Sequence, residues 1–251
     1  VWYRVKGDGN HKDTAGTKLT SDTSKVTIAK QTVDTPTIEF NPTGASYDGQ
    51  EHRPEVTVKD ANGRTIPAAE YTVSYGSTNW KDVGDHKVKI TAKDGGNYTF
   101  DETEGTFTIL PAGQSPLSIV GQPGRVQYGS VFTLSTNGGS GTGAVTWASS
   151  DDQVAFVNSQ TGWVEIKKAG GPVTITARKA AGGGYGETTA TWTFSAEKKP
   201  VTPIVTAQDK VYDATDKAEL VITWKDGDLL GNDSIAFVPD LTGKFSNANV
   251  G

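Results

Sequence analysis

The chain has 251 residues, of which 34% are hydrophobic and 21% charged, and its formal net charge is −5 at pH 7. It contains no cysteine and no methionine, which excludes disulfides, thiolate metal sites and a cysteine nucleophile. Charges of both signs are interspersed, so the basic patch typical of proteins that bind nucleic acid is missing. No apolar run approaches the ~18 to 20 residues that span a bilayer, and we expect no membrane insertion by this segment.

The length predicts more than one domain, because one antiparallel β-sandwich needs only ~100 residues. The sequence begins without methionine or a signal peptide, so we expect an internal part of a larger protein. Residues Val1 to Lys30 hold an alternating stretch, a Gly/Asp/Asn turn, a variable loop and a second alternating stretch. The same order recurs from Val88 to Leu110, which predicts that the chain opens with the tail of a preceding repeat.

A second group of alternating runs follows a linker predicted at Gln31 to Pro36. Between Thr37 and Leu110 the runs are T-I-E-F, E-V-T-V-K, E-Y-T-V-S-Y, H-K-V-K-I-T-A-K and T-F-T-I-L, and their period of two predicts β-strands. The D-A-N-G sequence at Asp60 to Gly63 is typical of a hairpin turn, because Asn and Gly tolerate positive φ. These strands predict an antiparallel sandwich that ends at a linker from Pro111 to Pro116.

The clearest alternation in the chain runs from Val145 to Ala177. It predicts four short strands, with turns at Asn158 to Gly162 and at Ala169 to Pro172 where Gly and Pro favour reversals. Further runs between Leu117 and Ser195 bring the total to about seven strands, as a sandwich requires. The residues expected to share an inward face within each strand are Val145 and Trp147, Ala155 and Val157, Val164 and Ile166, and Val173, Ile175 and Ala177.

Three motifs in this stretch point to a known module. They are W-x-S-S-D-x-x-V-A-x-V from Trp147, T-G-x-V from Thr161, and the K-A-G and I-T-A sequences within residues 168–177. With them the segment resembles the bacterial Ig-like family 2 module. The resemblance implies an Ig-like sandwich in an extracellular protein, and it implies no reaction.

The last part of the chain repeats an earlier one after a Lys/Pro linker predicted at Glu197 to Pro203. Val211 to Ile222 aligns with Ser46 to Val58, so that Tyr212-Asp213 matches Tyr47-Asp48. The Tyr-Asp signature and the closing G-K-F-S-N-A-N-V-G sequence resemble the YDG and MBG-type Ig-like repeats of bacterial surface and adhesin-like proteins.

The predicted fold class is therefore all-β, with tandem Ig-like antiparallel β-sandwiches in an elongated rod. Short Pro- and Gly-containing linkers between repeats of two types favour a series of modules over one compact enzyme. We predict four parts. They are the C-terminal fragment of a preceding Ig-like repeat (1–33), a YDG/MBG-like domain (34–112), a bacterial Ig-like family 2 domain (113–197), and the N-terminal part of a further YDG/MBG-like domain (198–251).

The residues that usually carry catalysis or bind metals show no productive spacing. The histidines His11, His52 and His86 stand alone, without a metal-ligand or triad pattern, and Gly138 to Gly143 lacks the Lys-Ser/Thr that follows in a phosphate loop. We therefore expect no catalytic residue, no metal and no cofactor. Asp- and Asn-containing loops offer oxygen ligands for Ca²⁺ without the spacing of an EF-hand, and we interpret them as turns: Asp8 to Asn10, Asp94 to Asn97, and Asp226 to Asp228.

Two alternatives remain for Tyr47-Asp48 and Tyr212-Asp213, namely a binding motif or an Asp that fixes a local turn, and the turn is favoured. Two alternatives also remain for Phe156 and Trp163, which the alternation turns outward. If Val157 pairs with Val164, the two rings lie diagonally on one exposed face. They then cover each other or a neighbouring module, or they form a platform for a glycan or protein partner.

Two classes of function fit these features, and neither is an enzyme. The first is a non-catalytic extracellular stalk or adhesion region of a bacterial cell-surface protein, located at the cell surface or cell wall, which spaces or presents binding domains to a host or matrix protein or a glycan. The second is a set of accessory, glycan-binding modules of a large secreted carbohydrate-active enzyme. Incomplete repeats at both ends also predict head-to-tail self-association by strand addition.

Overall fold

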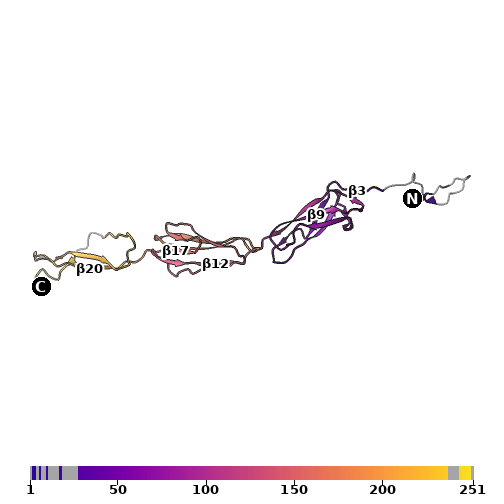
Figure 1. Ribbon diagram of the computed structural model, residues 1–251. Coiled ribbons are helices and arrows are strands. Elements are labelled where there is room, and N and C mark those ends of the chain that lie inside the picture. The colour runs from indigo at the N-terminus through magenta and orange to yellow at the C-terminus, as the bar shows by residue number, and fades with distance from the viewer. Residues whose placement is uncertain are drawn as a thin grey trace. The chain divides into compact units, whose positions relative to one another are not determined.

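The computed structural model describes residues 2–3, 6, 10, 17–18, 28–236 and 243–249. These residues form β-strands together with a short 3-10 helix, η2 (Ala68–Glu70) (Figure 1). The predicted all-β class with mainly antiparallel pairing is confirmed. The chain divides into two compact units, residues 1–112 and 113–251. The fragment predicted at 1–33 lies largely outside the described residues. Before residue 28, the described strands are β1 (Trp2–Tyr3) and β2 (Thr17–Lys18), which form an antiparallel pair.

The first unit is a sandwich of two main sheets. The five alternating runs predicted between Thr37 and Leu110 are all strands, which confirms this part of the prediction. One sheet has the order β4-β6-β7, and the other has the order β5-β11-β9-β8. The strand bounds are β4 (Thr37–Asn41), β5 (Ala45–Ser46), β6 (Glu55–Lys59), β7 (Thr65–Ile66), β8 (Tyr71–Tyr75), β9 (Gly84–Ala92) and β11 (Thr103–Leu110).

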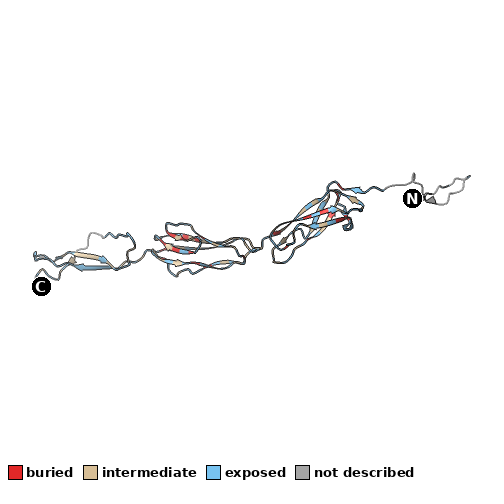
Figure 2. Cartoon of the chain, in the orientation of Figure 1, coloured by how far each residue is buried: buried red, intermediate tan, exposed pale blue. Residues whose placement is uncertain are grey.

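The core of this unit forms where the inward faces of the two sheets meet (Figure 2). Val58 from one sheet and Ile90 and Phe107 from the other are fully buried, as their alternate positions require. Trp80, from the connection between β8 and β9, is also fully buried, and its indole N–H donates to the Ser77 carbonyl at 2.8 Å. A loop residue thus contributes one of the largest side chains of this core.

The linker predicted at Gln31 to Pro36 is wrong in its first half. Gln31–Thr32 form a strand, β3, that pairs in parallel with β10 (Tyr98–Thr99). The Val33 N–H donates to the Thr99 carbonyl at 2.9 Å, and the Val33 side chain is buried in the core. Because the pairing partner lies far along the chain, the local pattern of residues 31–33 could not reveal it.

The second unit begins with a sandwich that contains two three-stranded sheets and one two-stranded sheet. Their strand orders are β13-β17-β16, β15-β18-β19 and β12-β14. The four strands predicted between Val145 and Ala177 are present as β15 to β18, and their expected inward residues are buried except for the half-buried Val145. The bounds are β12 (Leu117–Val120), β13 (Val131–Thr133), β14 (Ser135–Gly138), β15 (Val145–Ser149), β16 (Ala155–Val157), β17 (Trp163–Ile166), β18 (Gly170–Lys179) and β19 (Thr188–Ala196).

One of the two predicted turns in this sandwich is present and the other is not. At Asn158 to Gly162 the Asn158 Oδ1 accepts from the Gln160 and Thr161 N–H groups at 3.0 Å each, which closes the turn. Ala169 to Pro172 is no turn, because β18 already begins at Gly170. The ladder shifts register between Gly170 and Val173, so this Gly-Gly-Pro sequence forms a bulge rather than a reversal.

The C-terminal part of the second unit consists of two small antiparallel pairs. They are β20 (Pro203–Ala207) with β22 (Leu220–Trp224), and β21 (Lys217–Ala218) with β23 (Gly243–Lys244). The predicted linker is shorter than expected, because the Glu197 carbonyl accepts from the Tyr128 N–H at 2.9 Å and β20 starts at Pro203. From residue 198 onward no described residue is fully buried (Figure 2).

Candidate binding sites

The sheet β13-β17-β16 carries the two aromatic residues singled out in the sequence. Val157 pairs with Val164 as predicted, which turns Phe156 and Trp163 away from the core. Their ring centroids lie 6.2 Å apart at an interplanar angle of 63°, an edge-to-face contact. Trp163 is 39% exposed and Phe156 is half-buried. The diagonal arrangement is confirmed, and the two rings partly cover each other.

A cation and an exposed aliphatic side chain extend this aromatic pair. The Lys167 ammonium lies 4.6 Å from the centroid of the Phe156 ring, within the range of a cation–π contact. Val131 on the neighbouring strand is 60% exposed and, like Phe156, pairs with Glu165. Residues paired across strands share a face, so Val131, Phe156, Trp163, Glu165 and Lys167 form one surface, called here the aromatic platform.

The first Tyr-Asp motif forms a turn. Asp48 Oδ1 accepts from the Gln50 N–H at 2.8 Å and lies 2.7 Å from Nε2 of His52. The Gln50 hydrogen bond, followed by the His52 hydrogen bond, lowers the pKa of Asp48 because both stabilise the carboxylate. The carboxylate thus has the structural role that the sequence favoured.

The second Tyr-Asp motif repeats the turn and adds an ion pair. Asp213 Oδ1 accepts from the Thr215 N–H at 3.0 Å and hydroxyl at 2.9 Å, and from the Lys210 ammonium at 2.8 Å. The Lys210 contact, followed by the two Thr215 bonds, lowers the pKa of Asp213 from 3.8 to about 2. Lys210 also donates to the Thr215 carbonyl at 2.9 Å and to its hydroxyl oxygen at 2.8 Å. Its three N–H groups therefore have three acceptors.

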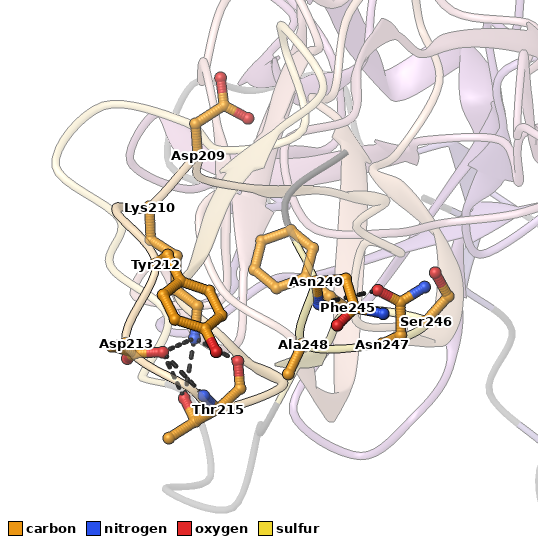
Figure 3. A pocket seen from close by; sticks show the side chains of 10 residues that line it. All are labelled: Asp209, Lys210, Tyr212, Asp213, Thr215, Phe245, Ser246, Asn247, Ala248 and Asn249. Atoms are coloured by element: carbon orange, nitrogen blue, oxygen red, sulfur yellow. Dashed lines mark hydrogen bonds and ion pairs between the residues drawn. The ribbon is translucent and has the colours of Figure 1, made fainter.

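A cavity of about 520 Å³ lies beside this second turn (Figure 3). Its wall includes the rings of Tyr212 and Phe245. Tyr212 is 63% exposed, and the centroid of the Phe245 ring lies 5.8 Å from the Lys210 ammonium. This pocket was not predicted from the sequence. Its only signal was the closing G-K-F-S-N-A-N-V-G sequence, and no local pattern places that sequence beside the turn. The lining residues are Asp209, Lys210, Tyr212, Asp213, Thr215, Phe245, Ser246, Asn247, Ala248 and Asn249.

Two of the other polar residues singled out in the sequence, His86 and Asn97, have structural partners. His86 is buried, stacks on Trp80 at 4.8 Å and has Nε2 2.8 Å from the Asp82 carbonyl. In the Asp94 to Asn97 loop, the backbone and side-chain N–H groups of Asn97 donate to Glu70 at 2.6 and 2.7 Å, which lowers the pKa of Glu70. His11 lies outside the described residues.

In the described part of the chain, no group of three or more His, Cys, Asp or Glu side chains is placed to hold a metal ion. No helix in these residues has the length and apolar character needed to cross a membrane.

Comparison with protein families gives one match, to the YDG domain, over residues 197–251. This confirms the resemblance predicted for the C-terminal part of the chain. The bacterial Ig-like family 2 resemblance of residues 113–197 and the YDG/MBG resemblance of residues 34–112 stay predictions. Among curated proteins, none matches the chain.

Several solved structures match the chain at low sequence identity and low TM-score. A C-terminal 282-residue fragment of intimin, solved with the intimin-binding domain of the translocated intimin receptor, is 18% identical with a TM-score of 0.25, covering 68% of this chain and 65% of that one. Murine CEACAM1b is 12% identical with a TM-score of 0.32, covering 65% and 100%. The protocadherin gammaB7 EC3-6 cis-dimer structure is 14% identical with a TM-score of 0.27, covering 76% and 54%. The chain thus spans less than two thirds of the intimin fragment.

Proposed function

We propose that this chain is a non-catalytic, extracellular part of a bacterial cell-surface protein that spaces and presents binding surfaces. The YDG match at residues 197–251 and the repeated Tyr-Asp turn support a series of modules. In this proposal residues 34–112, 113–197 and 198–251 are successive Ig-like domains, the middle one of the family 2 type. Their extended arrangement is part of the proposal, and a radius of gyration near the ~18 Å of a compact globule would contradict it.

The observation that carries this proposal is the aromatic platform. Trp163 is 39% exposed and Val131 60% exposed on one face of a sheet whose other face is fully packed. Trp at the centre of an interface often contributes a large share of the binding free energy. The platform combines apolar side chains with the cation of Lys167 and the carboxylate of Glu165, a mixture that suits a host or matrix protein surface better than a small molecule.

A matched pair of variants tests the platform. Purified matrix proteins are immobilised, and binding of the full chain is compared with that of Trp163→Ala and, as a control, Leu110→Ala, which removes an exposed aliphatic side chain from the first unit. We expect Trp163→Ala to weaken binding to at least one protein about tenfold or more, in the range of hot-spot truncations, and the control to leave it unchanged. Unchanged binding by a Trp163→Ala protein with parental circular dichroism rejects the platform.

A second candidate function is an accessory, glycan-binding region of a large secreted carbohydrate-active enzyme. The pocket beside Tyr212 favours it, because its lining combines the rings of Tyr212 and Phe245 with polar side chains such as those of Ser246 and Asn247. A catalytic domain elsewhere in the full-length gene would support this candidate, and a wall-sorting signal would support the first.

Self-association is a further part of the proposal. The described residues of the C-terminal part include Ile204 and Val205, each 48% exposed, on a two-stranded sheet, and such sheets are marginally stable alone. Residues 1–30 of a second copy carry alternating runs that could pair with it. Deleting residues 1–30 should then abolish concentration-dependent association in sedimentation velocity, and association that survives the deletion rejects the contact.

A further inference from the structure

Parallel pairing of strands follows one pattern in this chain. Among the residues that the structure describes, three contacts are parallel: β3 with β10, β5 with β11, and the bridge between Gln127 and Glu197. The other strand pairs of this part of the chain are antiparallel. Each parallel contact joins a segment near the start of a sandwich to a segment near its end.

In the first unit, backbone hydrogen bonds hold the start of the sandwich against its end. They run from the N–H groups of Gln31, Val33 and Tyr47 to the carbonyls of Asn97 at 2.8 Å, Thr99 at 2.9 Å and Leu110 at 2.8 Å. Side chains anchor the same segments, because Val33 is buried and Tyr47 packs against the hydrophobic cluster around Trp80. The entering chain is therefore attached both to its partner strands and to the core.

The sandwich of residues 113–197 has a similar contact, although its sequence differs. Glu197 directly follows β19, and its N–H donates to the Val126 carbonyl while its carbonyl accepts from the Tyr128 N–H, both at 2.9 Å. Val126 is buried. The Glu197 carboxylate also accepts from the Arg125 guanidinium, at 2.7 Å from Nε and 2.6 Å from the second nitrogen. This ion pair is exposed, and pairs of that kind contribute little, so the backbone hydrogen bonds dominate the contact.

The direction of these pairs decides how they respond to tension. Tension on the two ends of a sandwich pulls its first segment backward along the chain and its last segment forward. In a parallel pair, these pulls are opposite and lie along the strands, so the hydrogen bonds between them are loaded together. In an antiparallel pair that is pulled at two adjacent ends, the bonds open one after another. Forced unfolding is governed by the unfolding rate, and loading the bonds together slows it.

We propose that the parallel contacts are tension clamps, and that the chain is built to bear mechanical force through its sandwiches. This goes beyond the presentation of binding surfaces, which requires no resistance to force. Tension would reach the chain through the surface location proposed above, so the use of the clamps rests on that proposal. The clamps themselves can be measured on the isolated chain.

Single-molecule force spectroscopy with two attachment geometries tests the clamp of the first unit. The chain has no cysteine, so introduced cysteines define where the force acts. Lys30→Cys with Gly113→Cys pulls along the parallel contacts. Val83→Cys with Gly113→Cys pulls at adjacent ends of β9 and β11, where Gly84 pairs with Ile109. The three attachment positions are exposed. At equal force, we expect unfolding to be about tenfold or more slower in the first geometry, because several backbone hydrogen bonds must break together.

Two substitutions separate the clamp from general stability, both pulled through Lys30→Cys and Gly113→Cys. Gln31→Pro removes one clamp donor at an exposed residue, and unfolding at equal force should become about fivefold or more faster. Gly63→Ala strains a left-handed position, φ 76°, in the turn before β7. That turn is still folded when the clamp breaks, so the unfolding rate should change less than about twofold.

The clamp of the middle sandwich has its own matched pair. Glu197→Pro removes the N–H that donates to Val126, and forced unfolding of this sandwich should become about fivefold or more faster. Glu197→Gln keeps the N–H and removes only the charge that faces Arg125, so the parental rate should be retained. Equal acceleration by both substitutions would mean that the ion pair, and not the backbone contact, resists the force.

Three results would overturn the proposal for the first unit: equal unfolding rates in the two geometries, an unchanged rate in Gln31→Pro, or equal acceleration by Gly63→Ala. If Gln31→Pro does not fold, the two geometries decide. Failure of the proposed function is separately visible, because loss of protein binding in Trp163→Ala concerns the aromatic platform alone and no force measurement bears on binding.

Discussion

The turn at Tyr47-Asp48 and the turn at Tyr212-Asp213 have the same local hydrogen bond but differ in the packing around them. In both, the Asp carboxylate accepts from the N–H two residues later, at 2.8 Å from Gln50 and 3.0 Å from Thr215. The first turn lies against a packed core that contains Trp80, whereas the second borders an open cavity. Local sequence therefore specifies the turn, whereas the contacts around it come from segments distant in the chain.

The residue after each Asp sharpens the comparison. Gly49 has φ of 80° and Ala214 has φ of 61°, so both adopt the left-handed conformation. Glycine does so at no steric cost, whereas an L-residue with a Cβ pays about 1–2 kcal/mol. The second turn keeps this conformation even with alanine at position 214, because the hydrogen bonds from Lys210 and Thr215 to Asp213 stabilise the backbone of the turn.

The largest effect is expected from emptying the space beside the first turn. Trp80 contacts the rings of Tyr75 at 5.2 Å, His86 at 4.8 Å and Phe107 at 6.1 Å. Trp80→Ala should lower the free energy of unfolding of the first unit by about 3–5 kcal/mol, as a large buried aromatic does. Hydrogen exchange of β9 and β11 amides measures this loss. Protection of the β17 amides, in the second unit, should be unchanged. A loss of less than about 1 kcal/mol in the free energy of unfolding of the first unit would show that Trp80 does not stabilise the core beside the turn.

A smaller effect is expected from Gly49→Ala. No heavy atom lies within 4 Å of a Cβ built on Gly49, so the substitution acts through the backbone alone. It should cost about 1 kcal/mol, because left-handed strain is partly offset by the lower entropy of the unfolded chain. Urea unfolding of the first unit measures the change. Gly63→Ala is the comparison variant, because Gly63 is another left-handed glycine with open space around its Cβ position, and it should cost a similar free energy of unfolding. Unaltered stability in Gly49→Ala would contradict the backbone strain expected of alanine at this left-handed position.

The reverse substitution, Ala214→Gly, should stabilise the second turn. Relief of the left-handed strain outweighs the added entropy of glycine by about 0.5–1 kcal/mol. Because the Thr215 N–H donates to Asp213 Oδ1, its hydrogen-exchange protection should rise by a few-fold. A lower protection factor would mean that the alanine is not strained at this position.

The smallest expected effect is a pH dependence of the second turn. The pKa of Asp213 is about 2 in the folded chain against an ordinary 3.8, so its stabilising contribution is present above about pH 4 and is lost as the pH falls toward 2. Carboxylate ¹³C shifts should show this midpoint. Lys210→Gln should move the midpoint upward while that of Asp48 stays constant, and an Asp213 midpoint already near 3.8 in the parent chain would contradict the Lys210 contact.

Sequence pattern predicted the strands of the central sandwich well. Inward positions such as Val164 and Ile166 alternate with outward ones, and the pairing of Val157 with Val164 gave the direction of Phe156 and Trp163. The partial burial of Phe156 beneath Lys167 was not predicted, because it depends on side-chain conformation and not on strand period.

The sequence alone thus determined the local features of this protein, namely strands from a period of two and turns from Asp, Asn and Gly, because these depend on neighbouring residues. Tertiary structure decided the rest. It joined Gln31 and Thr32 to the distant strand β10, it made the Gly170-Gly171 stretch a bulge in the ladder with β19, and it placed Phe245 beside the Tyr212 turn. Each of these contacts brings together segments far apart in the chain, so no local pattern of residues records it.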